Sequence, residues 1–137
     1  MAGDFNWFEI QGYSCMDKKI LIAEDEAPLR DILAQKLKSL GFTIIIARDG
    51  DEALQRAQLQ KPDLMLLDII MPKKNGLEVI KALRKLKNKV PIIVLSNLDR
   101  PQDIEAGKHL GIDDYYVKSN ISIRLLCSKI NQKLYAS

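Results

Sequence analysis

The stretch DLMLLDIIMP, from Asp63 to Pro72, decides how the whole chain is interpreted. Four apolar residues in succession, 64–67, are typical of a strand that is covered on both faces of a sheet. A carboxylate, Asp68, follows at once, and more apolar residues and a proline come after it. Because burying an unpaired carboxylate costs free energy, we expect Asp68 to lie at the mouth of a site that supplies it with partners.

The composition fits one soluble domain. The length of 137 residues is typical of a single domain, and 47% of the residues are hydrophobic, which is enough to form a core. The formal net charge is only +3 and the lysines are scattered, which argues against a nucleic-acid-binding protein. The one basic run, 84–89, is interpreted as a solvated helix end. No apolar run reaches the roughly 18 residues of a membrane span.

The cysteines and the N-terminus favour a cytoplasmic protein. Cys15 and Cys127 form no C-x-x-C motif, and both are expected to be free thiols in a reducing compartment. The single histidine, His109, excludes a histidine-based metal cluster. The first residues contain no basic segment followed by an apolar core, so they are not a signal peptide. Residues 1–16 are interpreted as a tail or a non-native extension, with an aromatic docking arm as the alternative.

Short apolar runs alternate with amphipathic segments from residue 17 onward. The runs are rich in Ile, Val, Leu and Tyr and predict five strands: 19–23, 43–47, 63–67, 91–96 and 114–118. The segments between and after them predict helices, of which the first carries the stripe Leu29, Ile32, Leu33, Leu37 and Leu40. This order predicts an α/β fold, in which a doubly wound parallel sheet is connected by right-handed crossovers.

The limits of the helices also follow from local residue types. We expect the first helix to end before Gly41 and the second to be capped by Asp49 or Asp51. A third helix carries Leu77, Ile80 and Leu83, and a weaker fourth spans 100–111. The fifth carries Ile123, Leu126, Cys127, Ile130 and Leu134, so Cys127 is expected to be a buried apolar residue.

Polar side chains stand where four of the predicted strands end. Glu24, Asp25 and Glu26 follow the first strand, Asp68 follows the third, and Ser96 and Lys118 close the fourth and fifth. Ligands bind beyond the carboxyl ends of such strands, so we expect these groups to lie close together. Clustered carboxylates favour a hard cation such as Mg²⁺, and a hydroxyl with an ammonium group suits phosphate. Taken singly, each acid could instead be a turn or cap residue.

The motifs as a set resemble a known family. From Lys18 to about Leu134 the chain resembles the receiver domain of two-component response regulators, through ILIAEDE, LLDIIMPKKNGLEVI, PIIVLSN and GIDDYYVK. The resemblance implies a flavodoxin-like (βα)5 fold with strand order 2-1-3-4-5. It assigns residues 17–137 to the receiver domain.

The resemblance also implies a set of site residues. Asp68 looks like the phosphoacceptor, and Mg²⁺, with Mn²⁺ as the alternative, would be held by Asp25, Asp68, the backbone carbonyl of Ile70 and, through water, Glu24. The residues implied to contact the phosphate or to act in the switch are Ser96, Asn97, Lys118 and Tyr115, with Tyr116 as a competitor for Tyr115. Pro72 would give rigidity to the loop after Asp68, and Gly76 would supply permissive backbone angles there.

The chain departs from the family pattern at several of these positions. Glu24 stands where the family often has aspartate, Asn97 where alanine or glycine is usual, and Ser119 where proline is usual. Serine disfavours a cis bond, so we expect a rearranged turn with Ser119, Asn120 or Ser122 as a helix cap. Ile70 and Leu98 are apolar at positions that influence hydrolysis in the family, so we expect slow self-dephosphorylation.

The implied function is a phosphorylation switch and not an enzyme, with at most weak self-phosphorylation and self-dephosphorylation. A sensor histidine kinase or a phosphotransfer protein would supply the phosphoryl group, and the altered surface would bind an unknown downstream protein or form a homodimer. We expect no membrane association and no DNA-binding domain within this chain. The alternatives are a pseudo-receiver, which binds proteins or dimerises without phosphorylation, and a Mg²⁺-dependent phosphatase, for which no acid/base is evident beside Asp68.

Overall fold

The computed structural model describes residues 18–135 and confirms the predicted alternation of strands and helices. The interpretation of residues 1–16 and the thiol of Cys15 lie outside the described residues. The strands are β1 (Lys19–Ala23), β2 (Thr43–Ala47), β3 (Leu64–Leu67), β4 (Ile92–Ser96) and β5 (Asp114–Val117). The helices are α2 (Ala27–Ser39), α3 (Gly50–Gln60), α4 (Gly76–Lys85), α5 (Pro101–His109) and α6 (Ile123–Tyr135).

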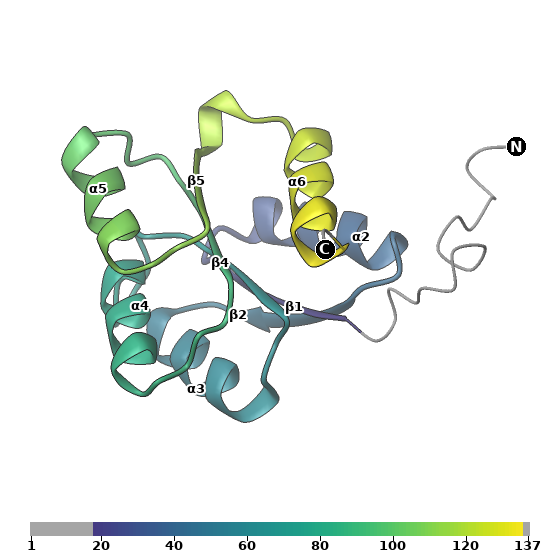
Figure 1. Ribbon diagram of the computed structural model, residues 1–137. Helices are drawn as coiled ribbons and strands as arrows, with labels where there is room; N and C mark the ends of the chain where they lie inside the picture. Colours follow the sequence, from purple (N-terminus) through teal and green to yellow (C-terminus); the bar gives the residue numbers. More distant parts are fainter. Residues whose placement is uncertain (1–17, 136–137) are drawn as a thin grey trace, which may run out of the picture.

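All five strands pair in parallel in the order β2-β1-β3-β4-β5, which confirms the flavodoxin-like topology. Helices α2 and α6 cover one face of the sheet, and α3, α4 and α5 cover the other (Figure 1). Strands β1, β3 and β4 lie inside the sheet, and their residues are almost all buried, as expected for apolar runs between two helical layers. The parallel pairing brings the carboxyl ends of β1, β3, β4 and β5 to one edge.

One apolar residue does not lie where the helical stripe predicted. Ile32 is 52% exposed, whereas Leu33 and Leu37 of the same helix are buried. Arg30, three residues before Leu33, lies on the buried side instead. Leu29, Leu33 and Leu37 are spaced by four residues and already form the covered stripe, which leaves Ile32 on the flank of the helix.

The ends of the helices fix the loops around the carboxyl edge of the sheet. Asp49 caps α3 by accepting a hydrogen bond from the Glu52 amide at 2.8 Å, which decides between the two predicted caps. Gly41, with φ 101°, follows α2 as predicted. A short 3-10 helix over Lys118–Asn120 leads into α6, where the Ser122 hydroxyl accepts from the Leu125 amide at 3.1 Å. Ser122 is therefore the cap among the three candidates.

Cys127 lies in the last helix, where the apolar pattern predicted a buried residue. Cys127 is a free thiol buried between α6 and the sheet, and burial raises its pKa. Within residues 18–135, every helix is too short or too polar to cross a bilayer.

Candidate functional site

Asp68 is the first residue after β3, and its carboxylate lies at the floor of the carboxyl edge of the sheet. Its amide donates a hydrogen bond to the Ala23 carbonyl at 3.0 Å, so the chain keeps the direction of the strand up to this residue. Oδ2 accepts from Lys118 Nζ at 2.8 Å, and Oδ1 accepts from the Ile70 amide at 3.3 Å. The side chain is only 5% exposed. Asp68 is thus a nearly buried carboxylate with a cation beside it, as the sequence predicted.

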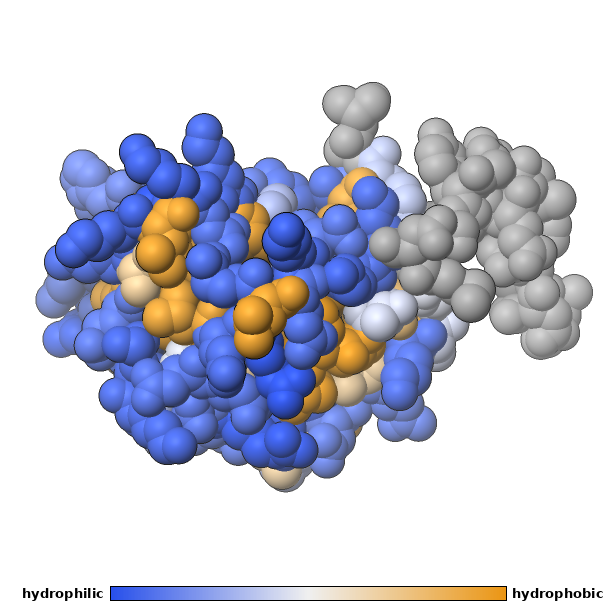
Figure 2. All heavy atoms as spheres, turned by 90° about the horizontal axis from the view of Figure 1, so that it is seen from below, coloured by the Kyte–Doolittle hydropathy of each residue, from blue (hydrophilic) through white to orange (hydrophobic). Residues whose placement is uncertain are grey.

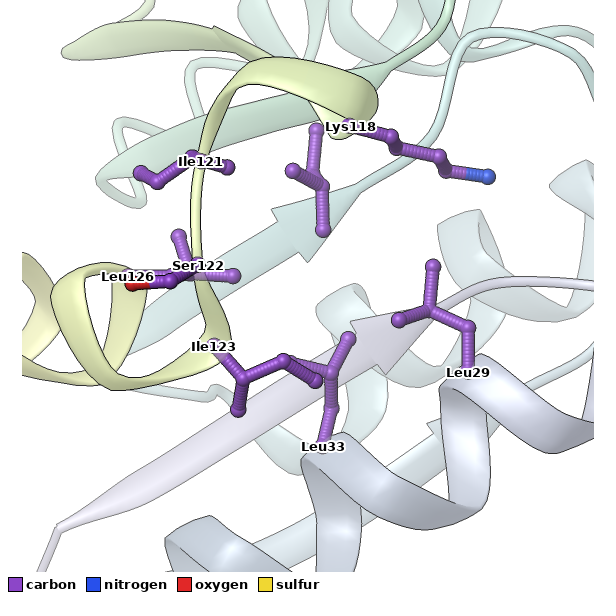
Figure 3. Close-up of a pocket in the computed structure, with 8 residues that line it drawn as sticks. Leu29, Leu33, Lys118, Ile121, Ser122, Ile123 and Leu126 are labelled. Atoms are coloured by element: carbon purple, nitrogen blue, oxygen red, sulfur yellow. The ribbon is translucent and has the colours of Figure 1, made fainter.

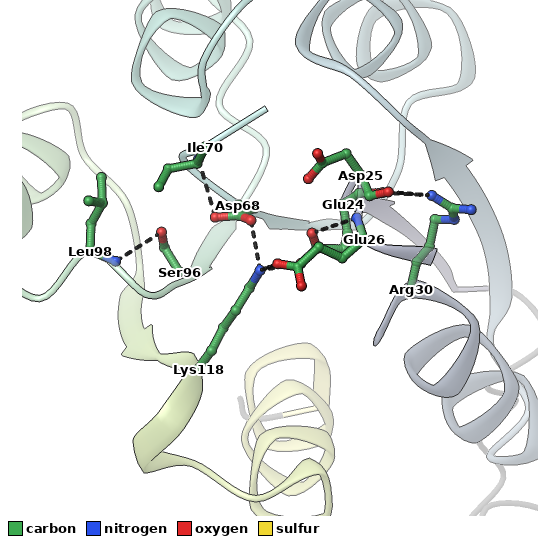
Figure 4. A network of polar contacts seen from close by, with 9 residues as sticks. All are labelled: Glu24, Asp25, Glu26, Arg30, Asp68, Ile70, Ser96, Leu98 and Lys118. Atoms are coloured by element: carbon green, nitrogen blue, oxygen red, sulfur yellow. Dashed lines mark hydrogen bonds and ion pairs between the residues drawn. The ribbon is translucent and has the colours of Figure 1, made fainter. Parts of the chain in front are cut away.

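Lys118 is the positive centre of the site (Figure 4). Its ammonium group lies 2.8 Å from Glu24 Oε1, 2.8 Å from Asp68 Oδ2 and 2.9 Å from Glu26 Oε1. Burial opposes the charge, but hydrogen bonds to Asp68, Glu24 and Glu26 outweigh it and raise the lysine pKa above its ordinary value. The ammonium group is therefore held charged. Glu26 is a partner of Lys118 that its sequence position alone did not reveal.

The acidic residues at the end of β1 have different environments. Glu24 is buried, and this burial raises its pKa from the ordinary 4.5 to about 7, despite the hydrogen bond from Lys118. Asp25 is exposed. Glu24, Asp25 and Asp68 each present a carboxylate oxygen within 4.8 Å of the others. Burial disfavours the charged form of Glu24, and hard oxygen donors at this spacing suit a small divalent cation. The donor set therefore fits Mg²⁺ or Mn²⁺.

Arg30 holds the backbone that carries both acids. Its Nη1 atom donates to the Glu24 carbonyl at 3.1 Å and to the Asp25 carbonyl at 3.3 Å, and the residue is 9% exposed. These bonds fix the turn between β1 and α2. The sequence reasoning missed this residue, although its position three residues before Leu33 places it on the buried side of the helix.

Ser96 and Asn97 lie at the end of β4, but they face different surroundings. Ser96 is fully buried, and its Oγ atom accepts from the Leu98 amide at 3.3 Å. Asn97 is exposed and lines a hollow of about 140 Å³ above Asp68. The other lining residues are Asp25, Glu26, Asp68, Ile70 and Lys118. The structure thus brings Asn97 to the mouth of the site, whereas the Ser96 hydroxyl interacts with its own loop and with the Tyr115 side chain.

Tyr115 is connected to the same loop, whereas Tyr116 is not. The Tyr115 hydroxyl donates to the Leu98 carbonyl at 2.7 Å, and burial raises its pKa. Its ring packs with the core on the α3–α5 face, and Tyr116 packs with the core under α2 and α6. Successive residues of a strand point to opposite faces, so only one of the two can reach the β4 loop. That residue is Tyr115.

The loop after Asp68 corrects the expected role of Gly76. Gly76 does not have a positive φ, so permissive backbone angles are not what it supplies. A Cβ atom at this position would run into the Asp68 carbonyl and the Ile69 backbone. The Gly76 amide donates to the Ile69 carbonyl at 2.7 Å. The lack of a side chain therefore lets the start of α4 approach the acceptor residue, and Ile70, 58% exposed, is left at the rim.

A small apolar pocket of about 70 Å³ lies on the other side of Lys118, between α2 and the start of α6. The side chains of Leu29 and Leu33 rise from α2 toward Ile121 and Ile123 (Figure 3). Lys118 lines both this pocket and the acidic hollow. An apolar surface therefore adjoins the charged site.

Comparisons with known proteins agree on one family. The family model described as the response regulator receiver domain matches residues 20–131. The alkaline phosphatase synthesis transcriptional regulatory protein PhoP of Bacillus subtilis is 44% identical over 103 residues. That match covers 75% of this chain but only 43% of the relative, so the chain corresponds to less than half of that protein.

Solved structures agree in fold. The receiver domain of the Francisella response regulator 1452 is 32% identical, with a TM-score of 0.79 over 84% of this chain and 94% of that one. The Mn²⁺-bound form of response regulator Rcp1 is 27% identical, with a TM-score of 0.76 over 88% of this chain and 96% of that one.

Proposed function

The chain belongs to the response regulator receiver domain family, and on that premise we propose that it accepts a phosphoryl group on Asp68 and thereby changes its binding surface. The observation that carries the proposal is the environment of one carboxylate. Asp68 is nearly buried, its Oδ2 atom is held by Lys118, and it opens into a hollow bordered by Asp25 and Glu26. A carboxylate in such a place can act as a nucleophile toward phosphorus.

The transfer itself needs little covalent work from the protein. A carboxylate oxygen of Asp68 attacks the phosphorus of a phosphohistidine, a P–O bond forms, and the P–N bond breaks. The imidazole nitrogen leaves with the electron pair and takes a proton from solvent. Oδ1 is the freer oxygen, because its described partner is the amide of Ile70 at 3.3 Å. Lys118 stays within reach of the phosphoryl oxygens and offsets their charge.

We assign the divalent cation to the acidic cluster. Asp25 and Asp68 would bind it directly, the Ile70 carbonyl would be a third protein ligand, and Glu24 would act through water. When bound, Mg²⁺ would offset the negative charge that develops on the transferred group. Mn²⁺ is the alternative, and the Mn²⁺-bound relative of similar fold supports it. The roles of Arg30 and Lys118 are to hold the acids in position and to supply the fixed positive charge.

The switch that we propose runs through the loop after β4. A phosphoryl group on Asp68 would attract the Ser96 hydroxyl, which is bonded to the Leu98 amide in the unphosphorylated chain. Movement of this loop would release the bond between Tyr115 and the Leu98 carbonyl. The population would then shift toward a state with a different surface over α5, β5 and α6. That surface would bind a downstream protein or a second copy of the chain.

The donor would be a sensor histidine kinase or a phosphotransfer protein, as in other receiver domains. We place its docking surface at the apolar pocket between α2 and the start of α6, because Lys118 lines both this pocket and the hollow. An apolar side chain of the donor in this pocket would bring its phosphohistidine near Asp68. The relative from Bacillus subtilis is a transcriptional regulatory protein by name, and it extends well beyond the match.

We also propose that the phosphorylated state is long-lived. Ile70 lies exposed at the rim of the hollow and Leu98 stands two residues after Ser96 in the loop, and neither side chain can orient an attacking water. The half-life after removal of the donor checks this directly, and Ile70→Asn should shorten it. A half-life that stays the same in this variant would contradict the assigned role of Ile70.

The proposed function is tested by incubating the chain with acetyl phosphate and Mg²⁺ and separating phosphorylated from unphosphorylated protein on a phosphate-affinity gel. We expect a shifted band that requires the metal and is absent in Asp68→Asn. Asp114→Asn, at the opposite end of the sheet, is the control and should retain the band. A chain that is never shifted, with its fold intact, would instead support the pseudo-receiver alternative.

A further inference from the structure

A hollow larger than the one at Asp68 lies at the opposite end of the sheet. A groove of about 460 Å³ lies at the amino ends of β3 and β4, between the C-terminal ends of α3 and α4. It is lined by residues of the segments 57–62 and 86–90. Figure 2 views the molecule from below Figure 1, the side to which these helix ends point, and shows hydrophobic patches set in hydrophilic surface. The groove takes no part in the chemistry proposed above.

The groove combines a basic rim with an apolar lining. Lys61, Lys87 and Lys89 line it and are exposed, and no acidic residue is among its lining residues. Pro62 and Val90 are buried lining residues, and Leu86 lines the groove with 55% of its surface exposed. A matching ligand therefore needs negative charges and apolar groups together.

The backbone at two of these lysines is not one that lysine favours. Among the described residues other than glycine, a positive φ occurs at Lys61 (48°), Lys73 (70°) and Lys87 (66°). Glycine and asparagine adopt this conformation more easily. The fold would thus be served at least as well without these two lysine side chains, although a cation near a helix C-terminus also interacts favourably with the helix dipole. If the lysines serve binding, replacing them should weaken ligand binding without lowering stability. If they serve the fold, replacing them should lower stability.

The groove is formed in advance of any ligand. Asn88 Nδ2 donates to Gln58 Oε1 at 2.7 Å and so connects the α4–β4 segment to α3. Arg84 Nη1 donates to the carbonyls of Asn88 and Val90, both at 3.0 Å. These bonds fix the wall that carries Lys87 and Lys89. A ligand would therefore bind with a small cost in ordering the protein.

We propose that this lysine groove binds an acidic, amphipathic peptide segment of a partner protein. The apolar lining and the volume of the groove favour a peptide over a small anion. Nucleic acid is disfavoured because no aromatic side chain lines the groove to stack on bases. The groove opens at the edge of the sheet opposite to Asp68, so the peptide and the phosphoryl group can be bound at the same time.

The test uses the 137-residue chain and a fluorescein-labelled peptide of alternating glutamate and leucine, with a matched peptide of glutamine and leucine. Fluorescence anisotropy measures the affinity, and amide chemical shifts locate the peptide. We expect saturable binding of the glutamate peptide with shifts in 57–62 and 86–90. The triple variant Lys61→Asn, Lys87→Asn, Lys89→Gln should weaken binding by about tenfold or more. Its melting temperature should stay the same or rise, because asparagine accepts a positive φ.

A second triple variant supplies the matched control. Lys36→Gln, Lys38→Gln and Lys108→Gln remove the same charge from exposed positions elsewhere and should change the affinity less than about twofold. Equal loss in both triple variants, or equal binding of the glutamine peptide, would overturn the proposal. So would shifts that map outside the groove, or tighter binding of an oligothymidylate of equal charge. A lower melting temperature of the groove variant would show that the lysines serve the fold.

Discussion

The acidic site at the carboxyl end of the parallel sheet and the lysine groove at its amino end hold their charged groups in different environments. At the carboxyl end, Glu24 and Asp68 are buried and share the ammonium group of Lys118. At the amino end, Lys61, Lys87 and Lys89 are exposed, and no acidic residue is among those that line the groove. Both sites are built on the same sheet, so they differ mainly in how far water reaches their charged groups.

The burial of a charged group decides how much free energy its substitution costs. Buried charges interact strongly and are costly when a partner is removed, whereas exposed charges are screened by water and salt. Substitutions at the carboxyl end should therefore change stability and chemistry together. Substitutions at the amino end should leave stability almost unchanged and affect only what binds there.

The largest effect is expected from removing the shared cation. Lys118→Ala would leave Glu24 and Asp68 buried without their ammonium partner and should lower the free energy of unfolding by about 3 kcal/mol in the absence of metal. Urea unfolding in EDTA measures this change. Lys89→Ala is the control at the amino end and should stay within about 0.5 kcal/mol of the parent chain. Equal effects of the two substitutions would remove the distinction between the two ends.

The second largest effect on stability is expected where the backbone packs closely beside Asp68. Gly76→Ala would push a methyl group into the Asp68 carbonyl and the Ile69 backbone, and should destabilise the domain by about 2 kcal/mol. Thermal unfolding measures the change, with Lys81→Ala on the exposed face of the same helix as the control. A neutral effect of Gly76→Ala would mean that α4 can shift away from Asp68 without cost.

The contribution of Glu24 to the free energy of unfolding should depend on pH. Its pKa rises from the ordinary 4.5 to about 7 through burial, so between these values the folded domain holds a proton that the unfolded chain has released. Metal-free stability should therefore fall as pH rises across this range, by at most about 3 kcal/mol. Glu24→Gln removes the ionisation and should raise the free energy of unfolding above pH 7 in EDTA by about 1 kcal/mol.

Measuring the free energy of unfolding at several pH values tests the direction of this change. Below pH 4.5 the parent chain and Glu24→Gln should have similar stability, because Glu24 is protonated in both the folded and the unfolded chain. Glu105→Gln, an exposed acid on α5, is the control and should change little at any pH. A Glu24→Gln chain that is less stable than its parent above pH 7 would show that the bond to Lys118 outweighs the cost of burial.

The smallest effect is expected at the edge strand. Tyr115→Phe removes the hydrogen bond to the Leu98 carbonyl but keeps the ring, and should cost about 1 kcal/mol. Phosphorylation of Asp68 should persist, whereas the response of the α5–β5–α6 surface, followed by amide chemical shifts, should weaken. Tyr116→Phe is the control on the opposite face. If Tyr116→Phe weakens the response more, the assignment of the two tyrosines is wrong.

Much of this arrangement could be predicted from the sequence. The apolar runs are short, uniform and separated by helical spacing, so the strands were placed within about one residue, and the family resemblance supplied their order. Parallel strands end at one edge, which is why Asp25, Asp68 and Lys118 were expected together. These predictions rest on periodicity and topology, both of which depend on many residues at once.

The rest depends on single contacts that periodicity does not encode. Arg30 is buried because two backbone carbonyls accept its hydrogen bonds, and Ile32 is exposed because its neighbours already cover the sheet. Gly76 is needed for a close approach of two backbones and not for its torsion angles. The lysine groove combines segments that are adjacent only after folding. The basic run at 84–89, which overlaps one of its walls, was interpreted only as a solvated helix end.

Site mapping shows directly whether Asp68 is the residue that accepts the phosphoryl group. Borohydride reduces an acyl phosphate on aspartate to homoserine, so the chain is incubated with acetyl phosphate and Mg²⁺, reduced, digested and sequenced by mass spectrometry. We expect homoserine at position 68, and only when both donor and metal are present. Homoserine at another acid, or labelling that persists in Asp68→Asn, would contradict it.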